Sequence, residues 1–238
     1  MTWVRLVAGT DTGVGKTVAT AALAAWHVTS GYSVVAVKAV QSGRTEGESG
    51  DADEVRRLAG VDAHELVRLP APLAPESAAL RSGVLLPTVD ELARRSVLVA
   101  GSAEAVLVEG SGGVAVRLDR AGGTLLDLGR ALEWHDIDGV DVVLVVRAGL
   151  GTLNHTELSL EAVRRARLLP AGLVVGAWPD VPGPAELANA VDLPRLTGLP
   201  VLATIPAGVG ALSGQAFRSS AVGWFAAPPD GDSWRPVV

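Results

Sequence analysis

The stretch GTDTGVGKT, Gly9 to Thr17, follows the apolar run WVRLVA and precedes the alanine-rich segment VATAALAAWHV. A glycine-rich turn between a strand and a helix can point successive backbone N–H groups at phosphates, beside the positive end of the helix. Gly13 and Gly15 permit such a turn, Lys16 reaches the β- and γ-phosphates, and Thr17 can ligate Mg²⁺. The strict pattern has its first glycine at position 10, one residue later than this chain. The sequence predicts a nucleoside triphosphate site, with a purely structural glycine turn as the alternative.

Short valine-rich runs recur along the chain and do not alternate with polar residues. Such runs are typical of parallel strands that helices cover on both faces. We expect strands at 4–8, 34–40, 105–108, 140–146, 173–175 and 201–205, and helices at 17–29, 51–58, 124–134, 154–168 and 185–196. This alternation predicts a single-domain, doubly wound α/β fold with a mostly parallel sheet flanked by helices, the P-loop NTPase fold.

The domain is expected to span residues 1–226 and to be followed by a flexible tail at 227–238. Within it, the proline-rich segment 70–87 is expected to be irregular except for one short helix near 76–81.

Composition excludes several classes of function. The chain has 238 residues, a formal net charge of -6 and no cysteine. The negative charge argues against nonspecific binding to nucleic acid or to an anionic membrane. The absence of cysteine removes disulfides and thiolate chemistry, and no apolar run is long enough to span a bilayer. We therefore expect a soluble, cytoplasmic protein.

Carboxylates follow the predicted strands where a metal ligand would be needed. Glu109 closes the run 105–108, and Asp51 and Asp53 open a predicted helix. Mg²⁺ prefers oxygen ligands, and one hydroxyl with one or two carboxylates suffices. Glu109 is interpreted as a metal or substrate ligand, with a helix cap or loop ion pair as the alternative. The two aspartates could equally serve the helix dipole.

Lys38 stands inside the apolar run VVAVKAVQSG, where a buried ammonium is costly without an anionic partner. Together with the glycine loop, "LVEGSGG", "GLGTLNHT" and "GLPVLATIPAG" follow in the same order as in dethiobiotin synthetases. The chain resembles that family from about residue 2 to residue 214.

The resemblance implies an ATP-dependent, Mg²⁺-dependent ring closure. The family converts 7,8-diaminononanoate, CO₂ (or bicarbonate) and a nucleoside triphosphate into dethiobiotin, nucleoside diphosphate and phosphate in biotin biosynthesis. A substrate amine captures CO₂ as a carbamate, whose oxygen attacks the γ-phosphorus. The second amine then closes the ring on the carbamic-phosphoric anhydride. No protein nucleophile is needed, so catalysis should come from positioning and from cations.

The resemblance also assigns roles to single residues. The catalytic positions match Thr12, Lys16 and Lys38, the metal positions match Thr17, Asp51 and Glu109, and the triphosphate positions match Gly13, Val14, Gly15, Lys16, Thr17 and Val18. Ser42, with Thr12, should hydrogen-bond the reacting end of the substrate. Asp51 is preferred over Asp53 because it opens the helix where the family has its aspartate.

The family's homodimer implies a site at the subunit interface. The segment formed by Gly151, Thr152, Leu153 and Asn154 resembles the loop and helix start that receive the substrate's tail carboxylate from the neighbouring subunit, where free N–H groups suit an anion. His155 is interpreted as a helix-start residue, with a catalytic role as the alternative.

Two departures from the family pattern stand out. Ala39 replaces a proline that many members have after the strand lysine. Gly176 and Ala177 stand where many members read adenine with an asparagine. The nucleotide site should then be completed by a wall of Trp178 and Pro179 and by backbone contacts from Pro206, Ala207 and Gly208. We expect relaxed nucleotide preference, with CTP among the accepted triphosphates, whereas Trp178 could instead serve packing.

Three other classes remain as rivals. A nucleotide switch of the partition or septum-site type would carry a second lysine where this chain has Asp11. An amide-forming P-loop ligase would bring a glutaminase domain and a cysteine. A degenerate member that binds without turnover would not need the two lysines, Thr17 and Glu109 intact.

Overall fold

The computed structural model describes residues 2–135 and 137–226. In this part of the chain, a seven-stranded sheet has the strand order β4-β2-β6-β1-β7-β8-β9, and every pairing within it is parallel. Its strands are β1 (Trp3–Gly9), β2 (Val34–Lys38), β4 (Asp62–Glu65), β6 (Ala105–Glu109), β7 (Gly139–Val146), β8 (Leu169–Trp178) and β9 (Val201–Pro206). A small parallel pair joins β3 (Gln41–Ser42) to β5 (Arg68–Leu69). The predicted parallel α/β architecture is confirmed.

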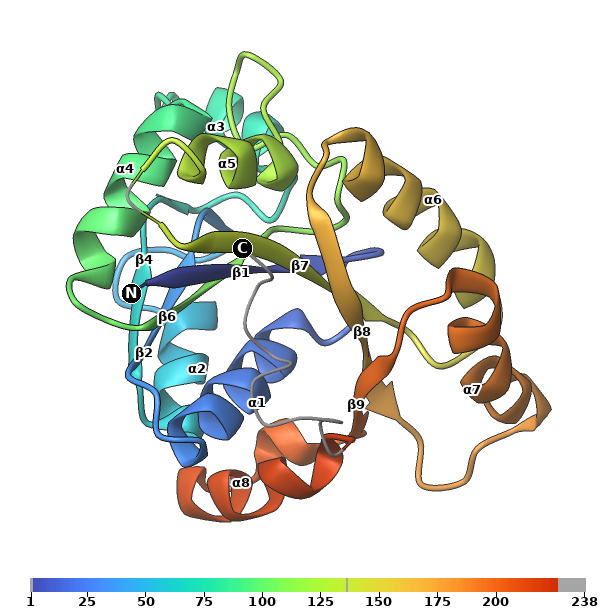
Figure 1. Ribbon diagram of the computed structural model, residues 1–238. Helices are drawn as coiled ribbons and strands as arrows, with labels where there is room; N and C mark the ends of the chain where they lie inside the picture. The colour runs from blue at the N-terminus through green and yellow to red at the C-terminus, as the bar shows by residue number, and fades with distance from the viewer. Residues whose placement is uncertain (1, 136, 227–238) are drawn as a thin grey trace.

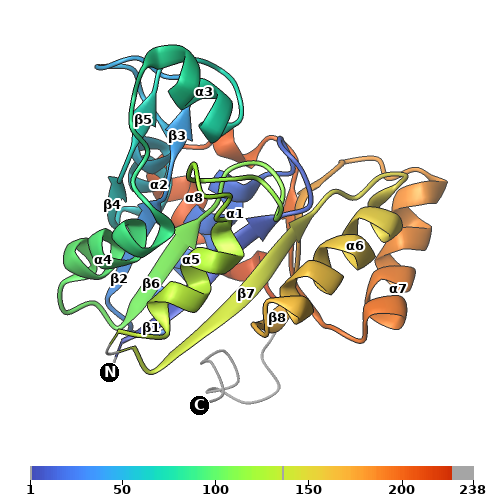
Figure 2. The same ribbon diagram turned by 90° about the horizontal axis from the view of Figure 1, so that it is seen from above.

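Helices cover both faces of the sheet (Figure 1). One layer holds α1 (Lys16–Thr29), α2 (Asp51–Ala59) and α8 (Gly214–Ala221), and the other holds α3 (Pro75–Ser82), α4 (Val89–Ala100), α5 (Leu125–Leu132), α6 (Thr152–Arg165) and α7 (Pro184–Thr197). Two short 3-10 helices, η1 (Val209–Ala211) and η2 (Val222–Trp224), flank α8. Figure 2 shows β3, β5 and α3 gathered together at one end of the large sheet.

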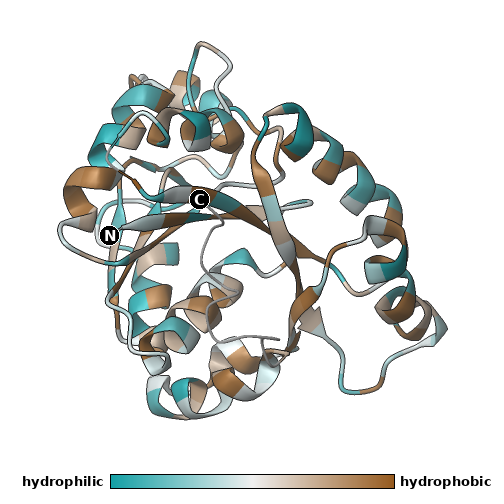
Figure 3. Cartoon of the chain, in the orientation of Figure 1, coloured by the Kyte–Doolittle hydropathy of each residue, from teal (hydrophilic) through white to brown (hydrophobic). Residues whose placement is uncertain are grey.

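The core is divided into two hydrophobic clusters, one on each face of the sheet. Hydrophobic residues run along the central strands, whereas the surrounding helices carry both kinds (Figure 3). Helix α1 is rich in alanine, which favours the helix, and its small residues at 19–25 are almost completely buried. Small side chains let α1 pack closely on the sheet, which fixes the glycine loop that precedes it.

Strand order brings three chain segments to one place. Lys38 and Glu109 are register partners across β2 and β6, and Val7 of β1 pairs with Glu109 from the other side. The carboxyl ends of β2, β6 and β1 therefore lie side by side. In doubly wound sheets, ligands bind beyond such carboxyl ends.

Most expected elements are found, with shifted ends. The second strand ends at Lys38 rather than at residue 40, because the chain then turns into β3. The strand expected at 173–175 is longer, at Leu169–Trp178, and the short helix expected near 76–81 begins at Pro75. The tail expected at 227–238 lies outside the described residues. None of the described helices is both long and apolar enough to cross a membrane.

Candidate active site

The glycine loop has the backbone that the sequence predicts. Gly13 and Gly15 have φ values of 76° and 97°, in the left-handed region that favours glycine, and α1 begins directly afterwards at Lys16. A Cβ atom on Gly9 would lie 2.9 Å from the Nζ of Lys16, so the lysine side chain passes close over this position and would have to shift if it carried a side chain.

Lys16 lies folded over the loop. Its Nζ donates to the carbonyl oxygens of Asp11 (2.9 Å) and Gly112 (2.7 Å). Burial, and then the neighbouring charge of Lys38, lower the pKa of Lys16 to about 8. Its ammonium donates to carbonyl oxygens rather than to a carboxylate, and it is less stable there than in water.

Lys38 is held by two carboxylates. Its Nζ lies 2.7 Å from Oδ2 of Asp51 and 2.8 Å from Oε1 of Glu109, and it also donates to the carbonyl of Gly110. Burial opposes the charged form, but Glu109 and Asp51 outweigh it and raise the pKa of Lys38 above its ordinary value. Lys38 is therefore a permanent cation at the floor of the site. Its sequence neighbour Ala39 donates its N–H to the carbonyl of Glu109 (3.2 Å), a bond that proline could not make.

Glu109, at the end of β6, connects Lys38 of β2 with α1. Thr17 donates its hydroxyl to Oε1 of Glu109 (3.0 Å), and the Thr20 hydroxyl lies 3.2 Å from Oε2 and 2.9 Å from the carbonyl of Lys16. Among the described residues, no three His, Cys, Asp or Glu side chains are grouped to hold a metal. Any cation here would use the hydroxyl of Thr17 and the carboxylates of Asp51 and Glu109, with the remaining ligands from water or phosphate.

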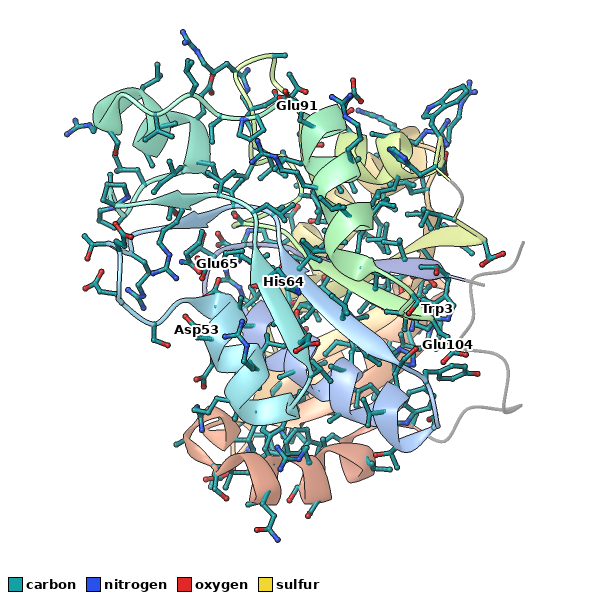
Figure 4. The ribbon with its side chains drawn as sticks, turned by 90° about the vertical axis from the view of Figure 1, so that its left-hand side faces the viewer. Trp3, Asp53, His64, Glu65, Glu91 and Glu104 are labelled. Atoms are coloured by element: carbon teal, nitrogen blue, oxygen red, sulfur yellow. The ribbon has the colours of Figure 1, made fainter. Side chains whose placement is uncertain are left out.

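The structure separates the roles of the two candidate aspartates. The carboxylate of Asp53 accepts the N–H of Gly50 (3.0 Å) and pairs with Arg56 (2.7 Å), and these contacts lower the pKa of Asp53. Figure 4 shows Asp53 at the start of α2, near Glu65 of β4. Asp53 thus supports the helix start, whereas Asp51 faces Lys38.

A cavity of about 620 Å³ lies over these groups. Of the residues expected at the site, its wall contains Thr12, Gly13, Gly15, Lys16, Thr17, Val18, Lys38, Ser42, Asp51 and Glu109. The sequence analysis missed Val40, Gln41, the segment 72–75, Ser111, Gly112 and Val116, which also line it. The segment 72–75 belongs to the proline-rich stretch, whose sequence has no periodicity to show where it folds back.

The other expected residues lie outside this cavity wall. Val14 is buried beneath the loop, and the segment 151–154 forms the start of α6. The residues expected around the nucleotide base lie at the carboxyl ends of β8 and β9, and Trp178 packs partly against the core. Gly176 nevertheless contacts the glycine loop, because a Cβ atom there would lie 1.9 Å from the carbonyl oxygen of Val14.

Asp11 is paired with a residue that follows β7. Its Oδ1 accepts the N–H of Thr12 (2.7 Å), and its Oδ2 lies 2.7 Å from Arg147. The Thr12 N–H and then Arg147 lower the pKa of Asp11. Asp11 therefore places a negative charge in the glycine loop, and its side chain contacts the segment between β7 and α6. His155, in the first turn of α6, adds favourable charge interaction with Asp11.

Lys16 and Lys38 are the only two lysines in the chain, against eighteen arginines. Both line one cavity, Lys16 from the start of α1 and Lys38 from the end of β2. A compact, movable ammonium suits a developing phosphoryl charge, whereas the planar guanidinium suits fixed pairs. This concentration of lysine is the feature that most clearly marks a site for phosphate chemistry.

Comparison with known proteins gives matches over nearly the whole chain. Residues 5–209 match a family model described as an AAA domain. The protein named ATP-dependent dethiobiotin synthetase BioD of Streptomyces coelicolor is 46% identical over 229 residues, covering 96% of this chain and 94% of that protein. The protein of the same name from Rhodococcus jostii is 48% identical over 221 residues, with 92% and 93% covered.

Solved structures show the same fold at low identity. The septum site-determining protein MinD of Pyrococcus horikoshii, complexed with Mg-ADP, gives a TM-score of 0.52 at 15% identity, over 99% of this chain and 93% of that chain. At this identity, the likeness concerns the fold alone.

Proposed function

The chain belongs to the family of ATP-dependent dethiobiotin synthetases, and we propose that it forms dethiobiotin in biotin biosynthesis from 7,8-diaminononanoate, CO₂ and a nucleoside triphosphate. The observation that carries this proposal is the convergence of both lysines of the chain on one cavity beside Glu109. The alternative of a nucleotide switch has support only at the level of fold.

The proposed reaction needs cations rather than a nucleophile. One substrate amine adds to CO₂ and loses a proton to give a carbamate. The carbamate oxygen attacks the γ-phosphorus and the nucleoside diphosphate leaves. The second amine then attacks the carbonyl carbon of the carbamic-phosphoric anhydride and loses a proton, and phosphate leaves as the ring closes. Negative charge develops at the phosphoryl group, which Lys16 and Lys38 would stabilise from two sides.

Other cavity residues would position the reacting groups. The hydroxyls of Thr12 and Ser42 line the cavity and would hydrogen-bond the diamine end or its carbamate. The N–H groups of the glycine loop would hold the triphosphate at the start of α1. Holding the carbamate oxygen in line with the γ-phosphorus would supply much of the rate.

The donor set around Glu109 fits Mg²⁺. The Thr17 hydroxyl and the carboxylates of Asp51 and Glu109 are the hard oxygen ligands that this ion prefers. When bound, the ion would neutralise charge on the transferring phosphates. Lys38 lies between the two carboxylates and would hold their orientation.

The start of α6 would receive the carboxylate tail of the diamine from a second subunit. Gly151 has a φ of 89°, and α6 runs for 14 residues after it, so its first N–H groups present a helix dipole. Leu150, beside this start, is 86% exposed, which suits burial against a partner.

We also expect the protein to be located in the cytoplasm, which cell fractionation would check.

Nucleotide preference is proposed to be relaxed. Gly176 and Ala177 offer no side-chain amide to a base, and Gly176 packs too closely on the glycine loop to be replaced. Backbone groups of 176–178 and 206–208 would then contact the base. A competition between ATP and CTP should show comparable use of both. Strict use of ATP would contradict this part of the proposal.

The decisive experiment measures phosphate release and dethiobiotin by mass, with Mg²⁺, bicarbonate and ATP or CTP, with and without 7,8-diaminononanoate. We expect release that depends on the diamine and equals the dethiobiotin formed. Phosphate release without diamine, and no product with it, would favour the switch class.

The lysine variants test the site within the same assay. Lys38→Ala should lower the rate of dethiobiotin formation at least a hundredfold while triphosphate binding persists, because Lys16 holds the β- and γ-phosphates. Lys38→Arg keeps a cation between Asp51 and Glu109 and controls for folding. An active Lys38→Ala enzyme would remove this lysine from the proposed chemistry.

A further inference from the structure

Gln41 lies between Lys38 and Asp51 in the sequence, and its side chain contacts the backbone of Asp51. It is the first residue of β3, its side chain is buried, and it forms part of the cavity wall. Its Oε1 accepts the backbone N–H of Asp51 (2.8 Å), and its Nε2 donates to the carbonyl oxygen of Ser42 (2.9 Å). Both ends of the amide are thus occupied by protein.

The bond to Asp51 replaces a missing helix cap. Helix α2 begins at Asp51, and the residue before it is Gly50, which has no side chain to accept an N–H. The first N–H groups of a helix need acceptors, and side-chain oxygens commonly supply them. Gln41 supplies one from another element, ten residues earlier in the chain.

The capped residue is itself part of the charge cluster. The carboxylate of Asp51 reaches Lys38 at 2.7 Å, and this side chain is about one third exposed. A carboxylate in that position is free to turn to water unless its backbone is fixed. The amide of Gln41 fixes it from the same strand end that carries Ser42.

We propose that Gln41 is a positioning residue that holds Asp51 against Lys38 and the metal site through the N-terminus of α2. The inference rests on the proposed function in assigning Asp51 to the metal. Gln41 does not touch the reacting atoms in this role; it acts through the backbone of Asp51.

The test compares Gln41→Leu with Gln41→Glu. Leucine removes the acceptor, whereas glutamate keeps a carboxylate oxygen to accept the N–H of Asp51. The exposed Gln215 of α8, the only other glutamine, gives the matched control Gln215→Leu. Gln41→Asn, which is one methylene shorter and cannot reach Asp51, replaces the leucine variant if that one does not fold.

The first readout needs neither metal nor activity. Hydrogen exchange of the peptide that covers residues 50–54 should become at least tenfold faster in Gln41→Leu than in the wild type. It should stay within threefold in Gln41→Glu and in the control. Unchanged exchange in Gln41→Leu would overturn the proposal.

The second readout separates positioning from substrate contact. In wild-type enzyme shown to make dethiobiotin, the Mg²⁺ concentration for half-maximal activity should rise about tenfold on Gln41→Leu, with kcat at saturating Mg²⁺ within threefold. A rise in the KM for the diamine with unchanged Mg²⁺ dependence would overturn the proposal in favour of direct contact. If the wild-type enzyme forms no dethiobiotin, the proposed function fails. The hydrogen-exchange measurement would still decide the role of Gln41 in that case.

Discussion

Lys16 of the free site changes its charge near neutral pH, unlike Lys38. Its pKa of about 8 reflects burial and the nearby charge of Lys38. A bound triphosphate favours the ammonium, so binding requires proton uptake once the free lysine is neutral. We predict that triphosphate affinity is constant below pH 8 and falls as pH rises above it, by up to about tenfold per pH unit. Calorimetric titration with ATP between pH 6.5 and 9.5 measures this slope.

Lys16→Arg provides the reference for that slope, because arginine stays charged over the whole range. Its affinity, whatever its level, should not change between pH 8 and pH 9.5. Equal slopes in the wild type and in Lys16→Arg would show that another group titrates.

At the residue scale, the sequence indicates which side chains form the site, but it does not indicate which contacts they make with one another. Lys38 is recognisable because it stands inside an apolar run, and Glu109 because it closes one. Their contact depends on β2 lying next to β6, which local sequence does not determine. Gln41 could not be identified, because its amide acts on a helix that begins ten residues later.

Among the elements, β8 and the glycine loop are joined through two glycines. A Cβ atom on Gly176 would lie 1.9 Å from the carbonyl of Val14, and one on Gly15 would lie 2.6 Å from the carbonyl of Gly176. The loop would have to move to accept either side chain. We predict that Gly176→Ala weakens triphosphate binding at least tenfold, as measured by equilibrium titration.

Gly223 provides a control for that substitution. It has open space where its Cβ would be, and its φ is not in the left-handed region, so Gly223→Ala should bind triphosphate as the wild type does. If Gly176→Ala kept full affinity with an unchanged unfolding temperature, the loop would not depend on this contact.

The elements that the sequence analysis missed have weak or different signals. Strand β4 is the polar segment Asp62–Glu65 at the edge of the sheet, and it has no apolar run. Helix α4 begins with a capping box of Thr88 and Glu91, a signal that the sequence itself carries. Short α8 follows the last strand and is held by packing of Phe217 rather than by a long periodic pattern.

At the scale of the whole molecule, a buried polar cluster joins the central strands to α1. Arg5 and Asp141 are register partners on β1 and β7, and their side chains make a two-point ion pair at 2.6 and 2.8 Å. His27 of α1 lies against this pair, with Nε2 3.5 Å from Arg5, and its ring also packs on Trp3. The cluster lies on the strand segments that precede the cavity, so its contribution is to stability rather than to chemistry.

Burial, and then the charge of Arg5, hold the pKa of His27 well below its ordinary value of 6.5. The unfolded chain therefore binds a proton near pH 6.5 that the folded protein does not yet bind, so stability falls as pH falls below 6.5. We predict that, as the pH falls below 6.5, the free energy of unfolding measured with urea decreases more in the wild type than in His27→Phe. The difference between the two proteins grows by up to about 1.4 kcal/mol per pH unit and reaches roughly 2 kcal/mol at pH 5. Phenylalanine keeps the ring packing, and the other histidines contribute equally to both proteins. Parallel stability curves between pH 7.5 and pH 5 would mean that His27 takes up its proton in the folded protein as readily as in the unfolded chain.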